Sequence, residues 1–281
     1  MIRHVVRATC AGLLAVVLVV GLNAMLHLVA RPMLYPASPM PVPTPPPSPF
    51  EEVRLASDHG EIVAWSAPGR RDDAPAVLLF HGNGENLETM RFSGQLDLWR
   101  GFTSRLVAVD YPGYGRSGGS PSEPALVDTG VLACEELATR LEGEPSAPPL
   151  VIVGWSLGAA VAVQVAARCD ATDGLVLASP WHDLLSLAGE HFPSFLARAA
   201  LRDRYDSAAA ARRLPVDLPT LVLHGTADRI IPIDHGRRLR TVLDDHLGDR
   251  LHWHEVTPAG HNDLFTRDDT WRAIRDFLLG L

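Results

Sequence analysis

Ser156 stands at the centre of the pentapeptide Gly154-Trp155-Ser156-Leu157-Gly158, which directly follows the apolar run Leu150–Val153. A second apolar stretch, Ala159–Arg168, comes next, so the sequence predicts a strand, a sharp turn and a helix with the serine at the apex. In this setting the G-x-S-x-G pattern is typical of a nucleophile elbow. The two glycines are expected because a tight turn brings backbone against backbone, and a Cβ would clash there.

A serine hydroxyl is a weak nucleophile, so it needs a base close by and an acid that orients the base. His261 follows the predicted strand Arg250–Val256 and is the expected base. Asp228 follows the strand Thr220–Leu223 and is the expected acid. Asp183, in the loop after the strand Gly174–Ala178, is the competing acid because that loop opens on the same edge of the sheet.

Two backbone amides are expected to bind the negative oxygen that forms when the serine attacks a carbonyl group. The first belongs to Asn83, in the loop His81-Gly82-Asn83-Gly84-Glu85-Asn86 after the strand Ala76–Phe80. The second belongs to Leu157, the residue after the serine. We expect His81 to orient its loop through hydrogen bonds, and Asp110 to accept backbone N–H bonds in the Gly- and Pro-rich loop that follows Arg105–Val109.

A metal site is the alternative use of the histidines. His252 and His254 share one face of a strand, and His261 follows it. No cysteine or glutamate completes a usual ligand set, so we expect neither a metal nor another cofactor. The three cysteines form no disulfide framework, and we expect Cys134 and Cys169 to be buried free thiols rather than a bridge.

The catalytic candidates all follow predicted strands, and the strands alternate with predicted helices. A hairpin of Glu51–Leu55 and Glu61–Ser66 comes first. The further predicted helices are Leu87–Arg100, Glu123–Leu141 with Ser122 as its N-cap, Asp234–Asp245 and Asp268–Leu279. Apolar strands between helices indicate an α/β protein with a mostly parallel twisted sheet and helices on both faces. Loops at the carboxyl ends of such strands share one edge, so Ser156, Asp228 and His261 should meet.

Composition limits the partners. The chain has 281 residues, 47% hydrophobic, and a formal net charge of −8. Beyond its N-terminal segments, roughly 230 residues remain, which suits one domain at residues 51–281. No basic stripe with interleaved aromatic residues is present, so nucleic acid is not an expected partner. We expect a monomer.

Residues Ala8–Ala30 contain no charged side chain. About 20 such residues span the hydrocarbon core of a membrane, so we expect residues 1–31 to form an uncleaved signal anchor with a transmembrane helix. A cleaved signal peptide and a buried core helix are the alternatives. Arg3 and Arg7 favour an N-terminus in the cytoplasm, which places the catalytic domain on the extracytoplasmic side of the membrane.

A proline-rich linker, residues 32–50, follows the apolar run and is densest between Pro36 and Pro49. Such segments favour the extended polyproline II conformation, with a reach of about 40 Å here. The linker is therefore expected either to hold the domain off the membrane or to lie along the domain surface.

Taken together, the motifs around Asn83, Asp110, Ser156, Asp228 and His261 resemble the α/β-hydrolase-domain serine hydrolases of the depalmitoylase and monoacylglycerol or lysophospholipid lipase type. The resemblance runs from about Val53 to the C-terminus. It implies the α/β-hydrolase fold, with Ser156 as nucleophile, Asp228 as acid and His261 as base, in the chain order of that family's triad. It also implies a short helical cap, which we expect at about residues 181–213.

Three functions fit these features. We expect a membrane-anchored serine hydrolase that cleaves carboxylic ester or thioester bonds of acyl or lipid substrates. A serine peptidase or amidase is the alternative enzyme, and a non-catalytic scaffold of the same fold is the alternative outside catalysis. An enzyme that displaces halide is disfavoured, because it would carry aspartate at position 156.

Overall fold

The computed structural model describes residues 21, 24–36, 46–143 and 147–281. An eight-stranded sheet crosses this part of the chain in the order β1-β2-β4-β3-β5-β6-β7-β8. Strands β1 (Glu51–Ser57) and β2 (Gly60–Pro68) form the predicted antiparallel hairpin, and β2 is also antiparallel to β4. From β4 to β8 each described neighbouring pair is parallel, so the predicted mostly parallel sheet is confirmed.

The parallel strands follow the apolar runs of the sequence closely. They are β3 (Ala76–Phe80), β4 (Arg105–Val109), β5 (Leu150–Trp155), β6 (Gly174–Ala178), β7 (Thr220–Gly225) and β8 (Leu251–Val256). Every residue of β3, β6 and β7 is buried, as expected for strands that are covered on both faces.

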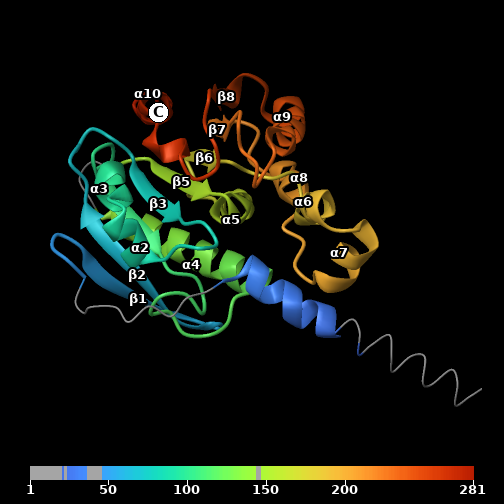
Figure 1. The fold of residues 1–281 in the computed structure, drawn as a ribbon. Coiled ribbons are helices and arrows are strands. Elements are labelled where there is room, and N and C mark those ends of the chain that lie inside the picture. The colour runs from blue at the N-terminus through green and yellow to red at the C-terminus, as the bar shows by residue number, and fades with distance from the viewer. Residues whose placement is uncertain (1–20, 22–23, 37–45, 144–146) are drawn as a thin grey trace, which may run out of the picture.

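Helices cover both faces of the sheet (Figure 1). Alternate residues of β3 enter different cores: Leu78 and Phe80 pack on one side, and Val77 and Leu79 on the other. The first side is covered by α4 (Glu123–Glu142), α5 (Leu157–Ala166) and α9 (Ile233–Leu247). The second is covered by α2 (Leu87–Phe92), α3 (Gln95–Arg100) and α10 (Asp268–Leu278). Two short 3₁₀ helices, η1 (Gly248–Arg250) and η2 (Leu264–Thr266), complete the described helices outside the cap and the N-terminal segment.

One predicted helix is wrong in its extent. Residues Leu87–Arg100 form two helices, α2 and α3, rather than one. The chain breaks at Ser93 and Gly94 because Gly94 takes a left-handed conformation with φ of 77°. Glycine adopts that conformation without steric cost, whereas a continuous helix excludes it.

The cap predicted at residues 181–213 contains α6 (Leu184–His191), α7 (Ser194–Ala200) and α8 (Ser207–Ala211). Glu123, in the first turn of α4, holds the end of the connection between α7 and α8. Its carboxylate accepts hydrogen bonds from the amides of Arg204 and Tyr205 at 2.7 and 2.9 Å. The cap is therefore attached to α4 by a partly exposed carboxylate contact as well as by apolar packing.

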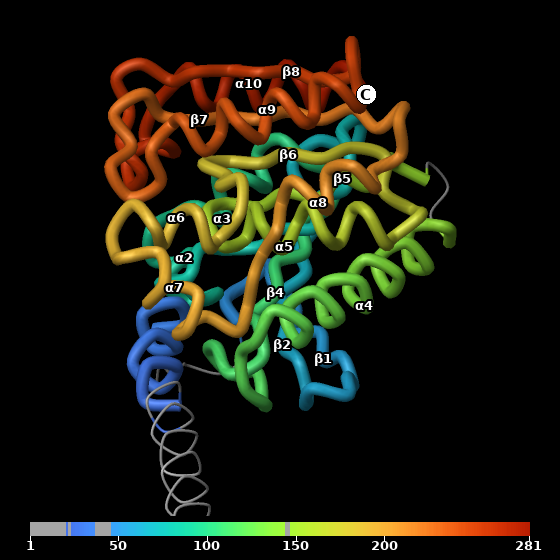
Figure 2. Tube along the Cα trace, turned by 90° about the vertical axis from the view of Figure 1, so that its right-hand side faces the viewer, coloured from blue at the N-terminus to red at the C-terminus, as the bar shows by residue number. Residues whose placement is uncertain are grey.

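The predicted transmembrane helix finds no support in the described residues, since none of their helices has the length and apolarity to cross a membrane. Most of the run Ala8–Ala30 lies outside the described residues. Residues 24–34 are helical and lie beside α7 (Figure 2). His27 Nδ1 lies 3.3 Å from the carbonyl oxygen of Ala200 at the end of α7. The last turns of the apolar run therefore contact the cap.

The described ends of the predicted linker, residues 32–50, pack on the domain. Tyr35, just before the prolines, is buried and donates a hydrogen bond to Asp203 at 2.9 Å. Phe50, just after them, packs on Trp65 with ring centroids 5.9 Å apart. Both ends of the linker thus lie on the domain, which agrees with the second alternative from the sequence, although residues 37–45 lie outside the described part.

The expectation of free thiols is also wrong. Cys134 of α4 and Cys169 after α5 form a disulfide, with Cα atoms 6.5 Å apart. The two helices pack side by side on one face of the sheet. This packing brings two cysteines that are 35 residues apart in sequence within bonding distance, which their spacing alone did not reveal.

Candidate active site

Ser156 sits between the end of β5 and the start of α5, with φ of 56° and ψ of −115°. A non-glycine residue rarely adopts a positive φ, and surrounding packing must hold it there. A Cβ on Gly154 would lie 2.1 Å from the carbonyl oxygen of Gly158, and one on Gly158 would lie 2.1 Å from that of Phe80. Both glycines are therefore required by close backbone contact, as the sequence predicted.

His261 contacts both other members of the predicted triad. Its Nε2 lies 3.0 Å from Ser156 Oγ, and its Nδ1 lies 2.7 Å from Asp228 Oδ2. Because a carboxylate only accepts, Nδ1 carries the proton and Nε2 is left to accept the serine proton. The indole of Trp155 packs on the imidazole with ring centroids 5.3 Å apart and helps to fix its orientation.

Asp228 is buried in the loop after β7, and backbone amides hold its second oxygen. Oδ1 accepts hydrogen bonds from the amides of Ile230 and Ile231 at 2.9 and 2.8 Å. Burial alone would raise the pKa of this carboxyl group. The hydrogen bond from His261 and the Ile231 amide outweigh burial, so the pKa of Asp228 lies below its ordinary value. The carboxylate stays ionised where an imidazolium would need it.

His224, near the carboxyl end of β7, supports the same loop. Its Nε2 donates to the carbonyl oxygen of Ile231 at 2.9 Å, and it lies 3.7 Å from Asp228. Burial lowers the pKa of His224, which keeps the ring neutral. This histidine therefore fixes the loop that presents Asp228 and adds no charge to the site.

The competing acid, Asp183, has a different role. It is the N-cap of α6, and its carboxylate accepts hydrogen bonds from the Ser186 amide and the Ser186 hydroxyl, both at 2.7 Å. His182 Nδ1 lies 2.9 Å from the same group. The structure thus brings His261 to Asp228, and it uses Asp183 to begin a cap helix.

The two expected oxyanion donors, Asn83 and Leu157, both line the cavity above Ser156. Leu157 is the first residue of α5, where no preceding helical turn accepts its N–H. In the loop after β3, Glu85 accepts the Gly82 amide at 3.0 Å. The Asn83 side chain donates to the carbonyl oxygen of Leu34 at 3.3 Å. These contacts fix the backbone around the Asn83 amide.

His81 supports this loop as predicted, and Asp110, which was predicted to accept amides in its own loop, accepts one at the start of α2. His81 is buried, and its Nδ1 lies 2.8 Å from the carbonyl oxygen of Gly82. Tyr111 packs on its ring and donates a hydrogen bond to its carbonyl oxygen at 2.8 Å. Asp110 Oδ1 accepts the amide of Leu87 at 3.0 Å. These contacts hold the loop and do not involve Ser156.

The histidines weighed as metal ligands are dispersed. His252 packs on Phe277 with ring centroids 5.6 Å apart, and His254 Nε2 lies 3.6 Å from Asp269. Across the described ranges, no group of three or more His, Cys, Asp or Glu side chains is arranged to hold a metal ion.

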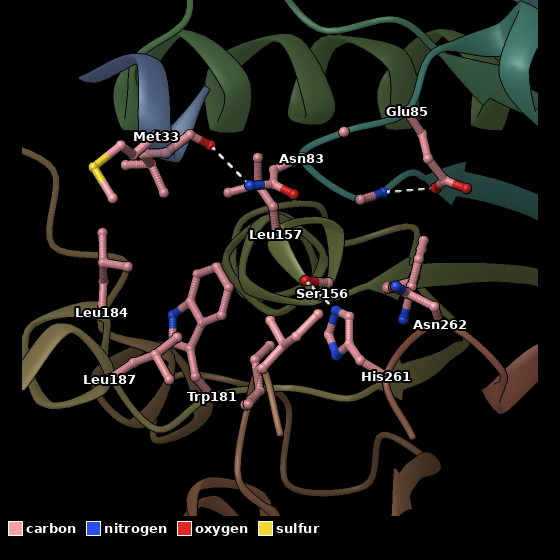
Figure 3. Close-up of a pocket in the computed structure, with 16 residues that line it drawn as sticks. Met33, Asn83, Glu85, Ser156, Leu157, Trp181, Leu184, Leu187, His261 and Asn262 are labelled. Atoms are coloured by element: carbon pink, nitrogen blue, oxygen red, sulfur yellow. Dashed lines mark hydrogen bonds between the residues drawn. The ribbon is translucent and has the colours of Figure 1, made fainter. Parts of the chain in front are cut away.

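A cavity of about 340 Å³ lies above Ser156 (Figure 3). Sequence reasoning missed part of its wall. Met33 and Leu34 come from the end of the N-terminal helix, which the sequence assigned to the proline-rich linker, residues 32–50. Glu85 is part of the predicted loop and Asn262 follows the predicted base, but the sequence assigned neither of them a role in the cavity wall. In Figure 3, Met33, Leu184 and Leu187 lie on one side of Ser156, and Glu85 and Asn262 on the other. One side of the cavity is therefore apolar and the other is polar.

The chain belongs to the alpha/beta hydrolase family. The family's model matches residues 77–212, which run from β3 through the elbow to the end of the cap. The strand order and the loops around Ser156 agree with this membership, and a hydrolase is the class of enzyme that family and fold support.

Among relatives, an uncharacterized protein of Mycobacterium tuberculosis is 32% identical over 254 residues, which cover 88% of this chain and 86% of that protein. An uncharacterized membrane protein of Saccharomyces cerevisiae is 29% identical over 82% of this chain and 80% of its own length. Lysophosphatidylserine lipase ABHD12 of Danio rerio is 27% identical over 62% of this chain and 49% of its own length.

Among solved structures, the Pyrococcus furiosus esterase Pf2001 has a TM-score of 0.66, with 16% sequence identity, 86% of this chain covered and 98% of that chain. A Pyrococcus horikoshii acylaminoacyl peptidase has a TM-score of 0.59, with 16% identity, 80% of this chain covered and 39% of that chain. At these identities the likeness concerns the fold.

Proposed function

We propose that this protein is a serine hydrolase that cleaves ester or thioester bonds of acyl substrates. The observation that carries the proposal is the continuous hydrogen-bonded path from Ser156 Oγ through His261 to the ionised Asp228. Ser156 lies at a strained turn directly below a cavity that can receive a carbonyl group. Strained backbone persists only where the surrounding packing imposes it. A scaffold without activity would have no reason to keep such packing around Ser156.

The proposed reaction follows from the protonation states of these groups. His261 Nε2 takes the proton of Ser156 while Oγ bonds to the carbonyl carbon of the substrate. The carbonyl oxygen becomes negative and accepts hydrogen bonds from the amides of Asn83 and Leu157. His261 then gives the proton to the departing alkoxide or thiolate, and an acyl-enzyme remains. Water, deprotonated by His261, attacks the acyl-enzyme. His261 then returns the proton to Ser156 Oγ as the acyl–oxygen bond breaks, and the acid is released. No cofactor takes part in these steps.

Acyl esters or thioesters are the proposed substrates because one half of the cavity is apolar. The lysophosphatidylserine lipase named among the relatives supports this class, since its name states that it acts on lysophosphatidylserine. An amide substrate would need the same groups, and the esterase and the peptidase among the similar structures share the fold only. No feature of the cavity favours peptides.

We also propose that the protein acts at a membrane, as a monomer, with its catalytic domain outside the cytoplasm. The uncharged run Ala8–Ala30 and the preceding Arg3 and Arg7 support this placement. The Cys134–Cys169 disulfide adds support, because disulfides persist mainly in oxidising compartments.

Labelling with an alkyl fluorophosphonate tests the nucleophile. The full-length protein should label at Ser156, and Ser156→Ala should abolish labelling and lower kcat on a p-nitrophenyl ester by about 10⁶-fold. Ser186→Ala is the matched control, because it removes a serine hydroxyl from the cap without touching the triad, and it should label like the wild type. An unlabelled wild type would reject a serine hydrolase, and equal labelling of Ser156→Ala would reject this nucleophile.

A further inference from the structure

A second cavity, of about 690 Å³, lies between the N-terminal helix and the cap helices α6 and α7. Its volume falls in the range of ligand-binding cavities, about 300–1,000 Å³. The N-terminal helix contributes Met25, Leu26, Val29 and Met33 to one wall, and the cap contributes residues such as Ala188 and Leu196 to the other. The proposed reaction leaves this space unassigned.

The N-terminal helix is held against the cap by polar contacts at both of its ends. Near its start, His27 lies 3.3 Å from the carbonyl oxygen of Ala200. Just after its end, the Tyr35 hydroxyl donates to Asp203 at 2.9 Å and lies 2.8 Å from the hydroxyl of buried Tyr205. Arg31 donates to the carbonyl oxygen of Pro121 at 3.1 Å. The wall that this helix forms is therefore part of the folded domain.

The second cavity adjoins the one above Ser156. Five side chains line both: Met33, Leu34, Leu184, Leu187 and Ile230. The two cavities thus share a boundary of five apolar side chains beside Ser156. A substrate that passes between these side chains would place in the larger cavity the part that stays attached to the serine.

The side chains that line the larger cavity indicate which kind of acyl group it can hold. Of the residues that line the larger cavity, only His191 and Arg229 carry titratable side chains, and the others are aliphatic, aromatic or methionine. Glu85 and Asn262 lie on the opposite side of Ser156, as Figure 3 shows. An unbranched hydrocarbon fits the apolar side, and a polar leaving group fits the side of Glu85 and Asn262.

We propose that the groove between residues 24–34 and helices α6 and α7 binds the acyl chain of the substrate, so that the N-terminal helix forms one wall of the substrate site. This inference rests on the proposed hydrolase function and specifies its substrate as a long, single acyl chain. The N-terminal segment then has two roles: it leads to the membrane that holds such chains, and it lines the groove that receives them.

A chain-length series tests the proposal on the full-length protein in one detergent. The p-nitrophenyl esters of acetate, butyrate, octanoate and dodecanoate are compared by kcat/KM. Burial of each added methylene should raise kcat/KM by about fourfold until the groove is filled. Short esters reach only the cavity above Ser156, so they report catalysis and folding independently of the groove.

Two pairs of adjacent residues supply matched variants. On the N-terminal helix, Val29 and Leu28 are 61% and 70% exposed, but only Val29 lines the groove. On α6, Ala188 lines the groove, whereas Gly189 does not line it and a Cβ there meets nothing within 4 Å. Val29→Trp and Ala188→Trp fill the groove, and Leu28→Trp and Gly189→Trp add the same side chain outside it.

The two groove variants should lower kcat/KM for dodecanoate by roughly tenfold or more, because an indole takes the place of several methylenes, and should leave butyrate hydrolysis within about twofold. The two controls should keep the wild-type profile. Equal profiles for Val29→Trp and Leu28→Trp would overturn the role of the N-terminal helix, and a flat wild-type series would overturn the groove. If wild type hydrolyses no ester of the series, the proposed function itself fails, which is a different result from either.

Discussion

Asp228 and His261 come from loops 33 residues apart in sequence, and their Oδ2 and Nδ1 atoms lie 2.7 Å from one another. The same carboxylate receives two backbone amides on its other oxygen, so its position does not depend on the histidine. The acid is thus fixed first by its own loop, and the imidazole is then oriented by the acid. This arrangement distinguishes Asp228 from Asp183, whose oxygens are occupied by the start of α6.

Asp228→Asn should reduce kcat on a short p-nitrophenyl ester by about 10⁴-fold. An asparagine amide keeps the size of the carboxylate but can stabilise the wrong imidazole tautomer and cannot balance the charge of an imidazolium. Steady-state kinetics on the purified full-length protein measure the effect.

The matched control for this variant is Asp183→Asn. It should retain most of the activity and most of the stability, because asparagine caps a helix N-terminus about as well as aspartate. An equal loss of kcat in the two variants would show that the acid is wrongly assigned.

Gly158→Ala should disrupt the elbow, because the added methyl group would lie 2.1 Å from the carbonyl oxygen of Phe80. Crowding of this kind costs about 1–3 kcal/mol even when the backbone shifts, and such a shift would displace Ser156 from His261. Thermal unfolding and ester hydrolysis should both decline. Gly84→Ala is the control: a Cβ there meets nothing within 4 Å, so its melting temperature should match the wild type. A stable and active Gly158→Ala would contradict the close-contact argument.

The sequence predicted the sheet and the meeting of Ser156, Asp228 and His261 because these depend on local signals. Buried parallel strands appear as short apolar runs, and the loops that follow parallel strands necessarily share an edge. The glycines at 154 and 158 could be interpreted for the same reason, since a tight turn leaves little room for side chains.

The sequence did not predict features that arise from packing between distant segments. Cys134 and Cys169 pair because α4 and α5 pack together, and nothing in the apolar pattern of either helix records that contact. Likewise, Met33 and Leu34 lie in the segment that the sequence assigned to the proline-rich linker, yet they line the cavity above Ser156. Hydrophobicity gives the preference for burial but does not identify what covers a side chain.

The Cys134–Cys169 disulfide determines how many cysteines should react with a thiol reagent. The chain has three cysteines, so the unreduced protein in denaturant should react with a thiol reagent only at Cys10, and the reduced protein at all three. Reduction should lower the stability by about 3–4 kcal/mol, the value expected for a loop of this length. Urea unfolding with and without dithiothreitol measures the change.

The double variant Cys134→Ala/Cys169→Ala provides the control, because its unfolding midpoint should not respond to the reductant. Three reactive thiols in the unreduced, denatured protein would restore the free-thiol interpretation of the sequence.

His235, buried on α9, should make the protein less stable in mild acid. Burial, together with the nearby Arg238 guanidinium, lowers its pKa to about 4. The unfolded chain takes up a proton at this histidine below about pH 6.5, whereas the folded protein resists protonation down to about pH 4. The contribution of His235 to the free energy of unfolding is therefore complete above about pH 6.5, and it is lost as the pH falls from about 6.5 to about 4. His235→Gln should lose less stability than the wild type between pH 7 and pH 5 in urea unfolding. Equal losses in both proteins would contradict a proton-linked role for His235.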